Sequence, residues 1–339
     1  MSDLVSVIEA IYRVDLPGAT WLGEILTAAR PLFDHGLGVW GGTYRACAGG
    51  IEFETLAARG VRLPGWMTLA RRSGPHLGAA SMARSVFSRT FGNAREMLPN
   101  YDDLLLARGA RAFGIEDAVG FNALDPSGYG VLVSAPMGAR ASFSEGSSER
   151  WSRVAVHLGA ACRLRRRFAG DPTGTPVAVL DHAAAVLDPG GRVVHATAAA
   201  AAPETRAMLR GAATAIDRAR ARLRRQDPDE ALAQWRAMVD ARWSIIDHYD
   251  RDGRRYVIAR QNQPEPRLPG SLTLRERQVV GFAALGRSNK LIAYELGLSE
   301  SAIATHLSNA AKKLGVHSRV ELVRSFAGTF TAPKTNGPC

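Results

Sequence analysis

The pattern of apolar and polar residues changes twice along the chain and predicts three domains. Residues 1–168 mix helical and strand-like patterns, residues 171–262 place strands on both sides of a helical middle, and residues 271–329 are helical. Residues 263–270 are rich in proline and are expected to be a linker. The pattern therefore predicts α+β domains followed by an all-α domain of four helices.

The first stretch begins with helices. Apolar residues at helical spacing predict a helix at 5–11 and a second at 20–33, and a glycine-rich run at 36–46 has strand character. Glycine and proline interrupt the helical pattern over 66–106, which indicates short helices there.

A hairpin and a long helix complete this stretch. Alternation at 116–124 and at 129–137 predicts two strands, and the turn-forming sequence at 125–128 joins them. A helix is predicted at 147–167 because apolar residues recur there at spacings of three and four.

The second stretch is smaller and has the same mixed character. Two hairpins are predicted, one from strands at 184–188 and 192–196, and one from strands at 241–249 and 254–262. Helical sequence fills 203–240 and is interrupted near Asp227-Pro228. Strands that flank a helical middle indicate a small α+β domain.

Capping residues define the C-terminal helices. Thr273 and Glu276 have the spacing of a capping box, in which each side chain bonds to the other residue's backbone N–H. Ser288 is expected to begin a second helix that Gly297 ends, and Ser299 to begin a third helix almost at once. Two helices joined by a turn of about three residues form a helix-turn-helix.

The third of these helices has two different faces. Its apolar residues fall on one stripe, which is expected to be buried: Ile303, Leu307, Ala310 and Leu314. The opposite face is small and polar at its start and cationic at its end: Ser301, Ala304, Thr305, Ser308 and Lys312. Small side chains allow a helix to enter the major groove of DNA, and cations and hydroxyls can hold phosphates.

The charge balance fits a polyanionic partner. The formal net charge is +11, and all four lysines lie near the C-terminus, at positions 290, 312, 313 and 334. Two groups of arginines, one around Arg163 and one from Arg218 to Arg225, are expected to be solvated faces. Contact with the DNA backbone or with another domain is the alternative for both groups.

The C-terminal sequence resembles the LuxR-type helix-turn-helix family. The matching positions are Leu272-Thr273, Arg275-Glu276, Gly286, Ser288-Asn289-Lys290, Ile292-Ala293, Leu296-Gly297, Ser299, His306, Lys313-Leu314-Gly315-Val316, Arg319 and Glu321-Leu322-Val323. The resemblance implies a transcription regulator whose third helix reads the major groove. It also implies a homodimer, often formed through the fourth helix, on a two-fold DNA site.

The resemblance further assigns roles to single residues. Ala304, Thr305 and Ser308 occupy positions that face base edges in this family, whereas Lys290, His306, Asn309 and Lys312 occupy positions that contact the DNA backbone. Ala302-Ile303 stands where the family commonly has Thr-Val, which removes one phosphate-binding hydroxyl. The base-facing positions carry no lysine here, so direct readout of the bases is expected to be limited.

The N-terminal stretches resemble a GAF-like domain over 1–168 and a PAS-like domain over 171–262, which would make both of them α+β sensor domains. Residues 1–120 contain no lysine, which excludes a phospho-receiver, and the chain lacks the GxxxxGK[ST] loop of an ATPase. Aromatic residues of the first domain could line a ligand cavity, although ordinary core packing is the alternative: Trp21, Trp40, Tyr44, Trp66, Phe113 and Phe121.

These features predict a cytoplasmic regulator that binds double-stranded DNA and associates with the bacterial nucleoid when bound. The N-terminal domains are expected to sense either a small-molecule ligand or a partner, with no cofactor, no metal site and no membrane segment. The alternative is a protein-interaction module that uses a degenerate helix-turn-helix for dimerisation. An enzyme is disfavoured because the sequence shows no pairing of nucleophile and base.

Overall fold

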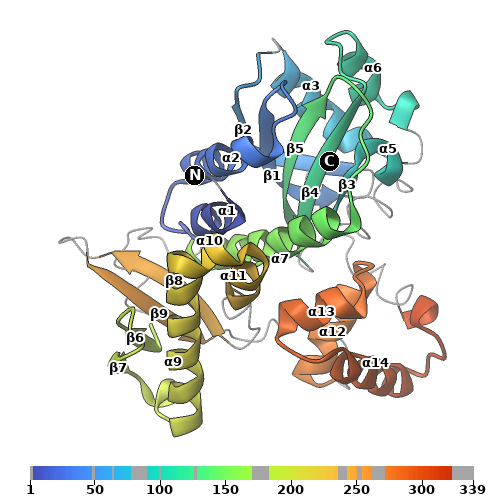
Figure 1. Cartoon of the computed structure of the whole chain (residues 1–339). Helices are drawn as coiled ribbons and strands as arrows, with labels where there is room; N and C mark the ends of the chain where they lie inside the picture. Colours follow the sequence, from blue (N-terminus) through green and yellow to red (C-terminus); the bar gives the residue numbers. More distant parts are fainter. Residues whose placement is uncertain are drawn as a thin grey trace.

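A computed structural model describes residues 3–47, 50–62, 65–77, 90–98, 101–125, 128–169, 183–235, 243–249, 254–261 and 272–322. The expected linker residues 263–270 lie outside these ranges, as do the end of the second hairpin and residues 323–329 of the C-terminal domain. Figure 1 shows two α/β units and a separate helical C-terminal unit.

The N-terminal unit is built on one antiparallel sheet. Its elements, in chain order, are α1 (Leu4–Ile11), α2 (Gly18–Phe33), β1 (Val39–Cys47), β2 (Gly50–Arg59), α3 (Trp66–Ser73), β3 (Phe91–Asn93), α5 (Ala94–Met97), α6 (Leu105–Arg111), β4 (Asp117–Leu124), β5 (Tyr129–Met137) and α7 (Glu145–Ala169). The five strands lie in the order β2-β1-β5-β4-β3. Short 3-10 turns at Gly74–His76 and Tyr101–Asp103 join the helices.

Helices cover both faces of this sheet, because alternate strand residues point to opposite sides. Phe121 of β4 packs with Trp21 of α2 and Val154 of α7 in the larger core. Tyr44 of β1 packs on the other side, with Trp66 of α3. Helices α1, α2 and α7 therefore lie on one face of the sheet, and α3, α5 and α6 lie on the other.

The second unit has a smaller sheet with strand order β7-β6-β9-β8. Its elements are β6 (Ala185–Leu187), β7 (Val193–Ala196), α9 (Pro203–Arg218), the π-helical segment η5 (Ala219–Leu223), α10 (Arg224–Gln226), α11 (Pro228–Gln234), β8 (Trp243–Tyr249) and β9 (Arg255–Gln261). Asp227 ends one helical segment and caps the next by accepting a hydrogen bond from Glu230 N. Both predicted hairpins and the break near residues 227–228 are present.

The C-terminal unit contains α12 (Leu274–Ala284), α13 (Asn289–Leu296) and α14 (Glu300–Leu314), followed by helical residues 319–322. The predicted capping box of Thr273 and Glu276 forms in both directions. Ser318 also caps the last segment, since its Oγ accepts from Glu321 N at 3.1 Å. The prediction of a fourth helix beyond residue 322 stays untested, because those residues lie outside the described ranges.

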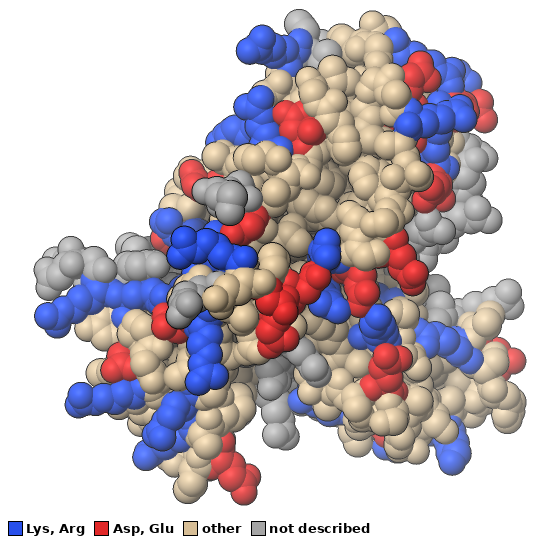
Figure 2. Space-filling view, viewed as in Figure 1, with Lys and Arg blue, Asp and Glu red and all other residues tan. Residues whose placement is uncertain are grey.

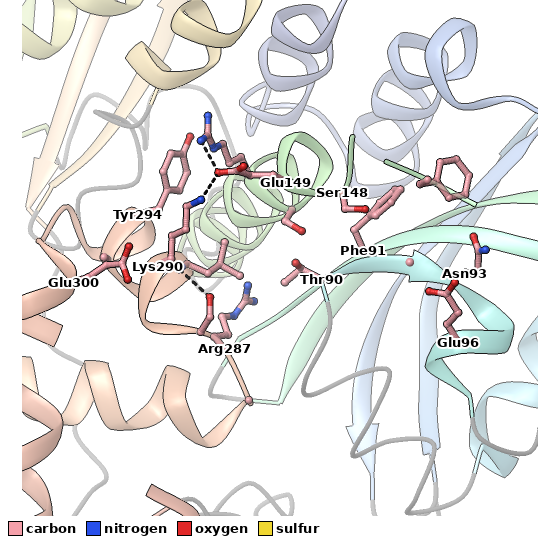
Figure 3. A pocket seen from close by; sticks show the side chains of 18 of the residues that line it. Thr90, Phe91, Asn93, Glu96, Ser148, Glu149, Arg287, Lys290, Tyr294 and Glu300 are labelled. Atoms are coloured by element: carbon pink, nitrogen blue, oxygen red, sulfur yellow. Dashed lines mark hydrogen bonds and ion pairs between the residues drawn. The ribbon is translucent and has the colours of Figure 1, made fainter. Parts of the chain in front are cut away.

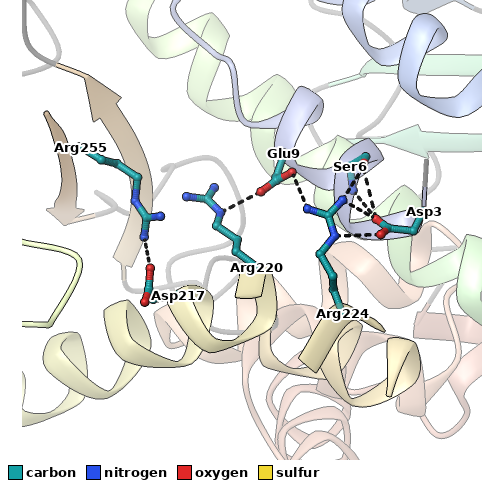
Figure 4. A network of polar contacts seen from close by, with 7 residues as sticks. All are labelled: Asp3, Ser6, Glu9, Asp217, Arg220, Arg224 and Arg255. Carbon is teal, nitrogen blue, oxygen red and sulfur yellow. Dashed lines mark hydrogen bonds and ion pairs between the residues drawn. The ribbon is translucent and has the colours of Figure 1, made fainter. Parts of the chain in front are cut away.

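Arginines join the second unit to the first. Arg224 donates to Asp3 Oδ2 at 2.8 Å and to Asp3 Oδ1 at 2.9 Å, and it also donates to Ser6 Oγ (Figure 4). Arg220 forms an ion pair with Glu9 at 3.1 Å. The prediction of a solvated face is wrong for these two arginines, and the alternative of an interdomain contact describes them.

Candidate functional site

The third C-terminal helix begins and ends where its sequence dictates. The Ser299 side chain accepts a hydrogen bond from Ala302 N at 3.2 Å and so caps the first turn of α14. Gly297 before the helix and Gly315 after it have φ values of 65° and 67°, which favour glycine. Residues 297–299 alone separate α13 from α14, which is the spacing of a helix-turn-helix.

Helix α14 buries its apolar stripe and exposes the opposite face. Ile303 and Ala310 are fully buried, and Leu307 and Leu314 are half-buried. The polar and small residues of the predicted DNA-facing side are exposed, and His306 is half-buried. The exposed ones are Ser301, Ala304, Thr305, Ser308, Asn309 and Lys312. The structure therefore leaves this face accessible to a partner in solvent.

The hydroxyl of Thr305 is engaged within the helix. Its Oγ1 donates to the Ser301 carbonyl oxygen at 3.0 Å, so in this arrangement the hydroxyl can still accept but not donate. An accepting oxygen suits the exocyclic amine of adenine or cytosine in the major groove. Ser308 carries a second exposed hydroxyl one turn further along the helix.

An ion pair fixes α14 against α12. Lys313 Nζ lies 2.9 Å from Glu276 Oε1 and 2.8 Å from Glu276 Oε2, and Glu276 is buried. Burial raises the pKa of this carboxyl, but the Lys313 ammonium and the bonds to Thr273 outweigh burial and lower it. Glu276 thus both caps α12 and holds α14 against it through Lys313.

Lys290, predicted to contact the DNA backbone, lies apart from the other predicted residues. It stands on the first turn of α13, and its Nζ is 2.8 Å from Glu149 Oε1 of α7. The ammonium of Lys290 lowers the pKa of the Glu149 carboxyl, and the Arg153 guanidinium acts in the same direction. Sequence reasoning did not identify Glu149, because the pair joins residues that are far apart in the chain.

The N-terminal unit contains a cavity of about 110 Å³ between its sheet and helices α3, α5 and α6. Trp40, Tyr44 and Asn122 line it from the sheet, and Trp66 and Ser73 line it from α3. None of the described residues that line this cavity carries a charge. Such a lining favours an uncharged and largely apolar occupant.

Three polar groups of the lining are buried and lack a hydrogen-bond partner in the described part of the chain. They are Trp40 Nε1, Trp66 Nε1 and Ser73 Oγ. A buried donor without a partner costs about 1–3 kcal/mol, so such groups are rarely left unsatisfied. Trp40 and Trp66 stand edge to face, with ring centroids 6.0 Å apart.

Two tyrosines of the lining remain neutral. Tyr44 Oη donates to Asn122 Oδ1 at 2.6 Å, and burial raises the pKa of Tyr44 well above its usual value. Burial also raises the pKa of Tyr101 to about 12. The cavity therefore offers neutral tyrosine hydroxyls throughout the physiological pH range.

The six predicted aromatic residues divide between the two faces of the sheet. Trp40, Tyr44 and Trp66 line the cavity, and Phe113 packs edge to face on Trp66 with ring centroids 6.4 Å apart. Trp21 and Phe121 lie in the core on the other face. Their rings are structural there, and Trp21 Nε1 donates to the Ile11 carbonyl oxygen at 2.8 Å.

Metal and membrane sites are not found among the residues that the structure describes. In those ranges, no group of three or more His, Cys, Asp or Glu side chains could hold a metal ion. No helix within the described residues is long and apolar enough to cross a membrane.

Comparison with known proteins identifies the class of the C-terminal unit. Residues 270–326 match the family model of bacterial regulatory proteins, luxR family. This part of the chain is therefore a LuxR-type helix-turn-helix domain, and the resemblance seen in the sequence is confirmed for it. The resemblance of the N-terminal units to GAF-like and PAS-like domains stays a prediction.

Particular relatives of this domain are transcriptional regulators. The monoamine regulon transcriptional regulator of Klebsiella aerogenes is 49% identical over 61 residues, which are 18% of this chain and 27% of that protein. The transcriptional regulatory protein MctR of Rhizobium johnstonii is 45% identical over 53 residues, which are 16% of this chain and 25% of that protein. The HTH-type transcriptional regulator MalT of Vibrio cholerae is 36% identical over 78 residues, which are 23% of this chain and 9% of that protein. The chain thus matches about a quarter or less of the length of these relatives.

A solved structure spans more of the chain but resembles it little. Escherichia coli SdiA covers 96% of this chain and 95% of its own, with 13% sequence identity and a TM-score of 0.30. At that TM-score, no argument about the fold or the ligand of the present chain follows.

Proposed function

We propose that this protein is a sequence-specific transcriptional regulator that inserts α14 into the major groove of double-stranded DNA. The observation that carries the proposal is the exposed face of α14 within a LuxR-type domain. Its side chains are small at the start of the helix, where close approach to base edges is needed, and Lys312 lies nearer the end, where it would meet phosphates. The protein would act in the cytoplasm, as a homodimer on a two-fold site.

Selection of bound sequences from a pool of random DNA duplexes tests this function. The full chain is expected to enrich one motif made of two half-sites. Thr305→Ala and Ser308→Ala are each expected to relax the preference at one position per half-site, with a loss of about 0.5–1.5 kcal/mol of discrimination, the net worth of one hydrogen bond. Enrichment of no motif at low salt would exclude sequence-specific binding and favour an interaction module.

We further propose that the cavity of the N-terminal unit binds a compact, uncharged, mainly apolar molecule that carries hydrogen-bond acceptors. The three buried donors without partners support this assignment, because an acceptor atom of a ligand would satisfy them. A volume of about 110 Å³ is smaller than the usual range of ligand pockets, roughly 300 Å³ and above, and suits a compact molecule rather than a long chain.

A thermal-shift screen of neutral, compact ketones, esters and amides tests the ligand proposal. A compound that raises the melting temperature of the full chain should lose most of that effect in Trp66→Phe, which keeps a six-membered aromatic ring but removes the indole N–H. Phe113→Leu, which changes an aromatic residue next to Trp66 but outside the lining, serves as the control. Equal shifts in both variants would place the ligand elsewhere.

A further inference from the structure

Helix α13 of the DNA-binding domain packs against α7 of the N-terminal unit. Leu291 and Tyr294 of α13 pack against Val156 and Ala160 of α7. Tyr294 Oη is also 3.2 Å from Nε2 of the buried His157. The contact therefore combines apolar packing with a hydrogen bond that reaches the core of the N-terminal unit.

A buried cluster of charged side chains lies at one end of the contact between α7 and α13. Arg163 of α7 lies 3.1 Å from Glu295 of α13 and 3.4 Å from Asp125, which follows β4. Arg287, just before α13, lies 3.8 Å from Glu295 and donates to the Leu124 carbonyl oxygen. Glu295 and Arg287 are only 1% and 5% exposed, so this cluster forms when the two units are in contact.

Such a cluster makes the contact specific but reversible. The free energy needed to take these charges out of water nearly cancels the gain from their mutual attraction. Removing one partner, however, leaves a buried charge unpaired, which is strongly destabilising. The contact between α7 and α13 should therefore be easily disturbed by a change in any one of its charges.

The Arg163 group was predicted from the sequence as a solvated face, and for Arg163 that prediction is wrong.

Lys290 lies at the other end of the contact between α7 and α13. The family resemblance predicts that this residue contacts the DNA backbone. Figure 3 shows Lys290 pointing at Glu149 across a cleft between the two units, and the cleft has a volume of about 700 Å³. Glu96 lines the same cleft from the N-terminal unit, and Glu300 lines it at the start of α14. Acidic and basic side chains also meet along this junction on the surface in Figure 2. A DNA phosphate that approached Lys290 here would meet carboxylates.

We propose that α7 is an intramolecular docking surface that lowers the DNA affinity of the helix-turn-helix domain by holding Lys290 on Glu149. The proposal rests on the DNA-binding function proposed above. In the docked arrangement, Ala304, Thr305 and Ser308 remain exposed, so docking removes a phosphate contact and does not cover the base-facing residues. Release of α13 from α7 returns Lys290 to the DNA backbone and raises affinity at every sequence.

Strand β4 links this docking surface to the cavity. Asn122 of β4 faces the cavity and bonds to Tyr44, while Leu124 at the end of the same strand accepts from Arg287. Asp125, the next residue, accepts from Arg163. Strand β4 thus runs from the lining of the cavity to the residues that hold the docked domain.

The test compares Glu149→Lys with Glu145→Lys in the full chain. Both substitutions change the net charge equally on the same helix, but Glu145 is exposed one turn earlier and does not line the cleft that holds Lys290. With a mixed-sequence duplex of about 30 base pairs at low salt, Glu149→Lys should bind about threefold to tenfold more tightly than Glu145→Lys. Equal affinities would overturn the proposal.

A distance measurement checks docking without DNA. Spin labels on Arg108→Cys and Val320→Cys, which are exposed positions on the two units, report their separation, with Cys47 and Cys339 changed to serine. Glu149→Lys should broaden the distance distribution, and Glu149→Lys combined with Lys290→Glu should restore it while DNA affinity stays low. An unchanged distribution in Glu149→Lys would also overturn the proposal. If no form binds duplex DNA, the DNA-binding function itself fails, and the distances still decide whether α7 holds α13.

Discussion

His157 links the domains and gives the protein a predictable response to acid. It is fully buried in α7, with Nδ1 3.1 Å from Tyr12 Oη and Nε2 3.2 Å from Tyr294 Oη. Burial lowers the pKa of His157 from 6.5 to about 3. A neutral imidazole donates one hydrogen bond and accepts another, whereas a protonated one can only donate.

The sign of the effect follows from the two pKa values. The folded-state pKa of His157 lies below the unfolded value of 6.5, so the unfolded chain binds a proton first as the pH falls. The stability due to neutral His157 is complete above that value and is lost as the pH falls from 6.5 toward 3. Between pH 7 and pH 5, this amounts to about 2 kcal/mol of unfolding free energy.

Urea unfolding of the full chain at both pH values, followed by tryptophan fluorescence, measures this loss. Carboxylates also titrate between these pH values. The informative quantity is therefore the change in unfolding free energy between pH 7 and pH 5, compared between the wild type and each variant. His157→Gln, which can still donate and accept, should lose about 2 kcal/mol less than the wild type between pH 7 and pH 5. His195→Gln, at an exposed position, should behave as the wild type. The same pH dependence in the wild type and in His157→Gln would refute the reasoning.

Two further substitutions test one contact within the DNA-binding domain and one contact between the first two units. Glu276→Ala removes the capping box of α12 and the partner of Lys313, and it should lower the stability of the DNA-binding domain by about 1–3 kcal/mol in thermal unfolding. Arg224→Ala removes the bonds to Asp3 and should destabilise the junction of the first two units by about 1 kcal/mol, as measured by a double-mutant cycle with Asp3→Asn. Arg225→Ala, at an exposed neighbouring position, is the control, and equal effects of the two arginine changes would contradict the assigned role of Arg224.

Much of the C-terminal domain could be predicted from the sequence because its signals are local. Ser299 and Gly297 lie within a few residues of the helix ends that they define, and the stripe of Ile303 and Ala310 repeats at helical spacing. The predicted hairpin of β4 and β5 forms for the same reason, since alternation and turn residues are short-range patterns. Strand β3 is missed within the broken helices predicted over 66–106, because three residues cannot show a period.

The candidate sites depend on contacts between distant residues, which one sequence does not reveal. Phe121 and Asn122 are neighbours in β4 but face opposite sides of the sheet, and the sequence does not say which side holds the cavity. Glu149, the partner of Lys290, and Glu295, one partner of Arg163, are each more than one hundred residues away in the chain, so these charges could be identified but not paired. The backbone thus follows from local patterns, whereas the cavity and the docking contact follow from tertiary packing.

The central claim, that α14 carries the DNA-binding surface, is tested most directly by salt titration of duplex binding with Lys312→Ala. Lys312 is exposed near the end of α14 and should displace about one counterion when it meets a phosphate. The account predicts that Lys312→Ala weakens binding at all sequences and reduces the slope of log affinity against log salt by about one, whereas Arg206→Ala on α9 leaves the slope unchanged. A slope that is the same in the wild type and in Lys312→Ala, or a protein that ignores duplex DNA at low salt, would contradict it.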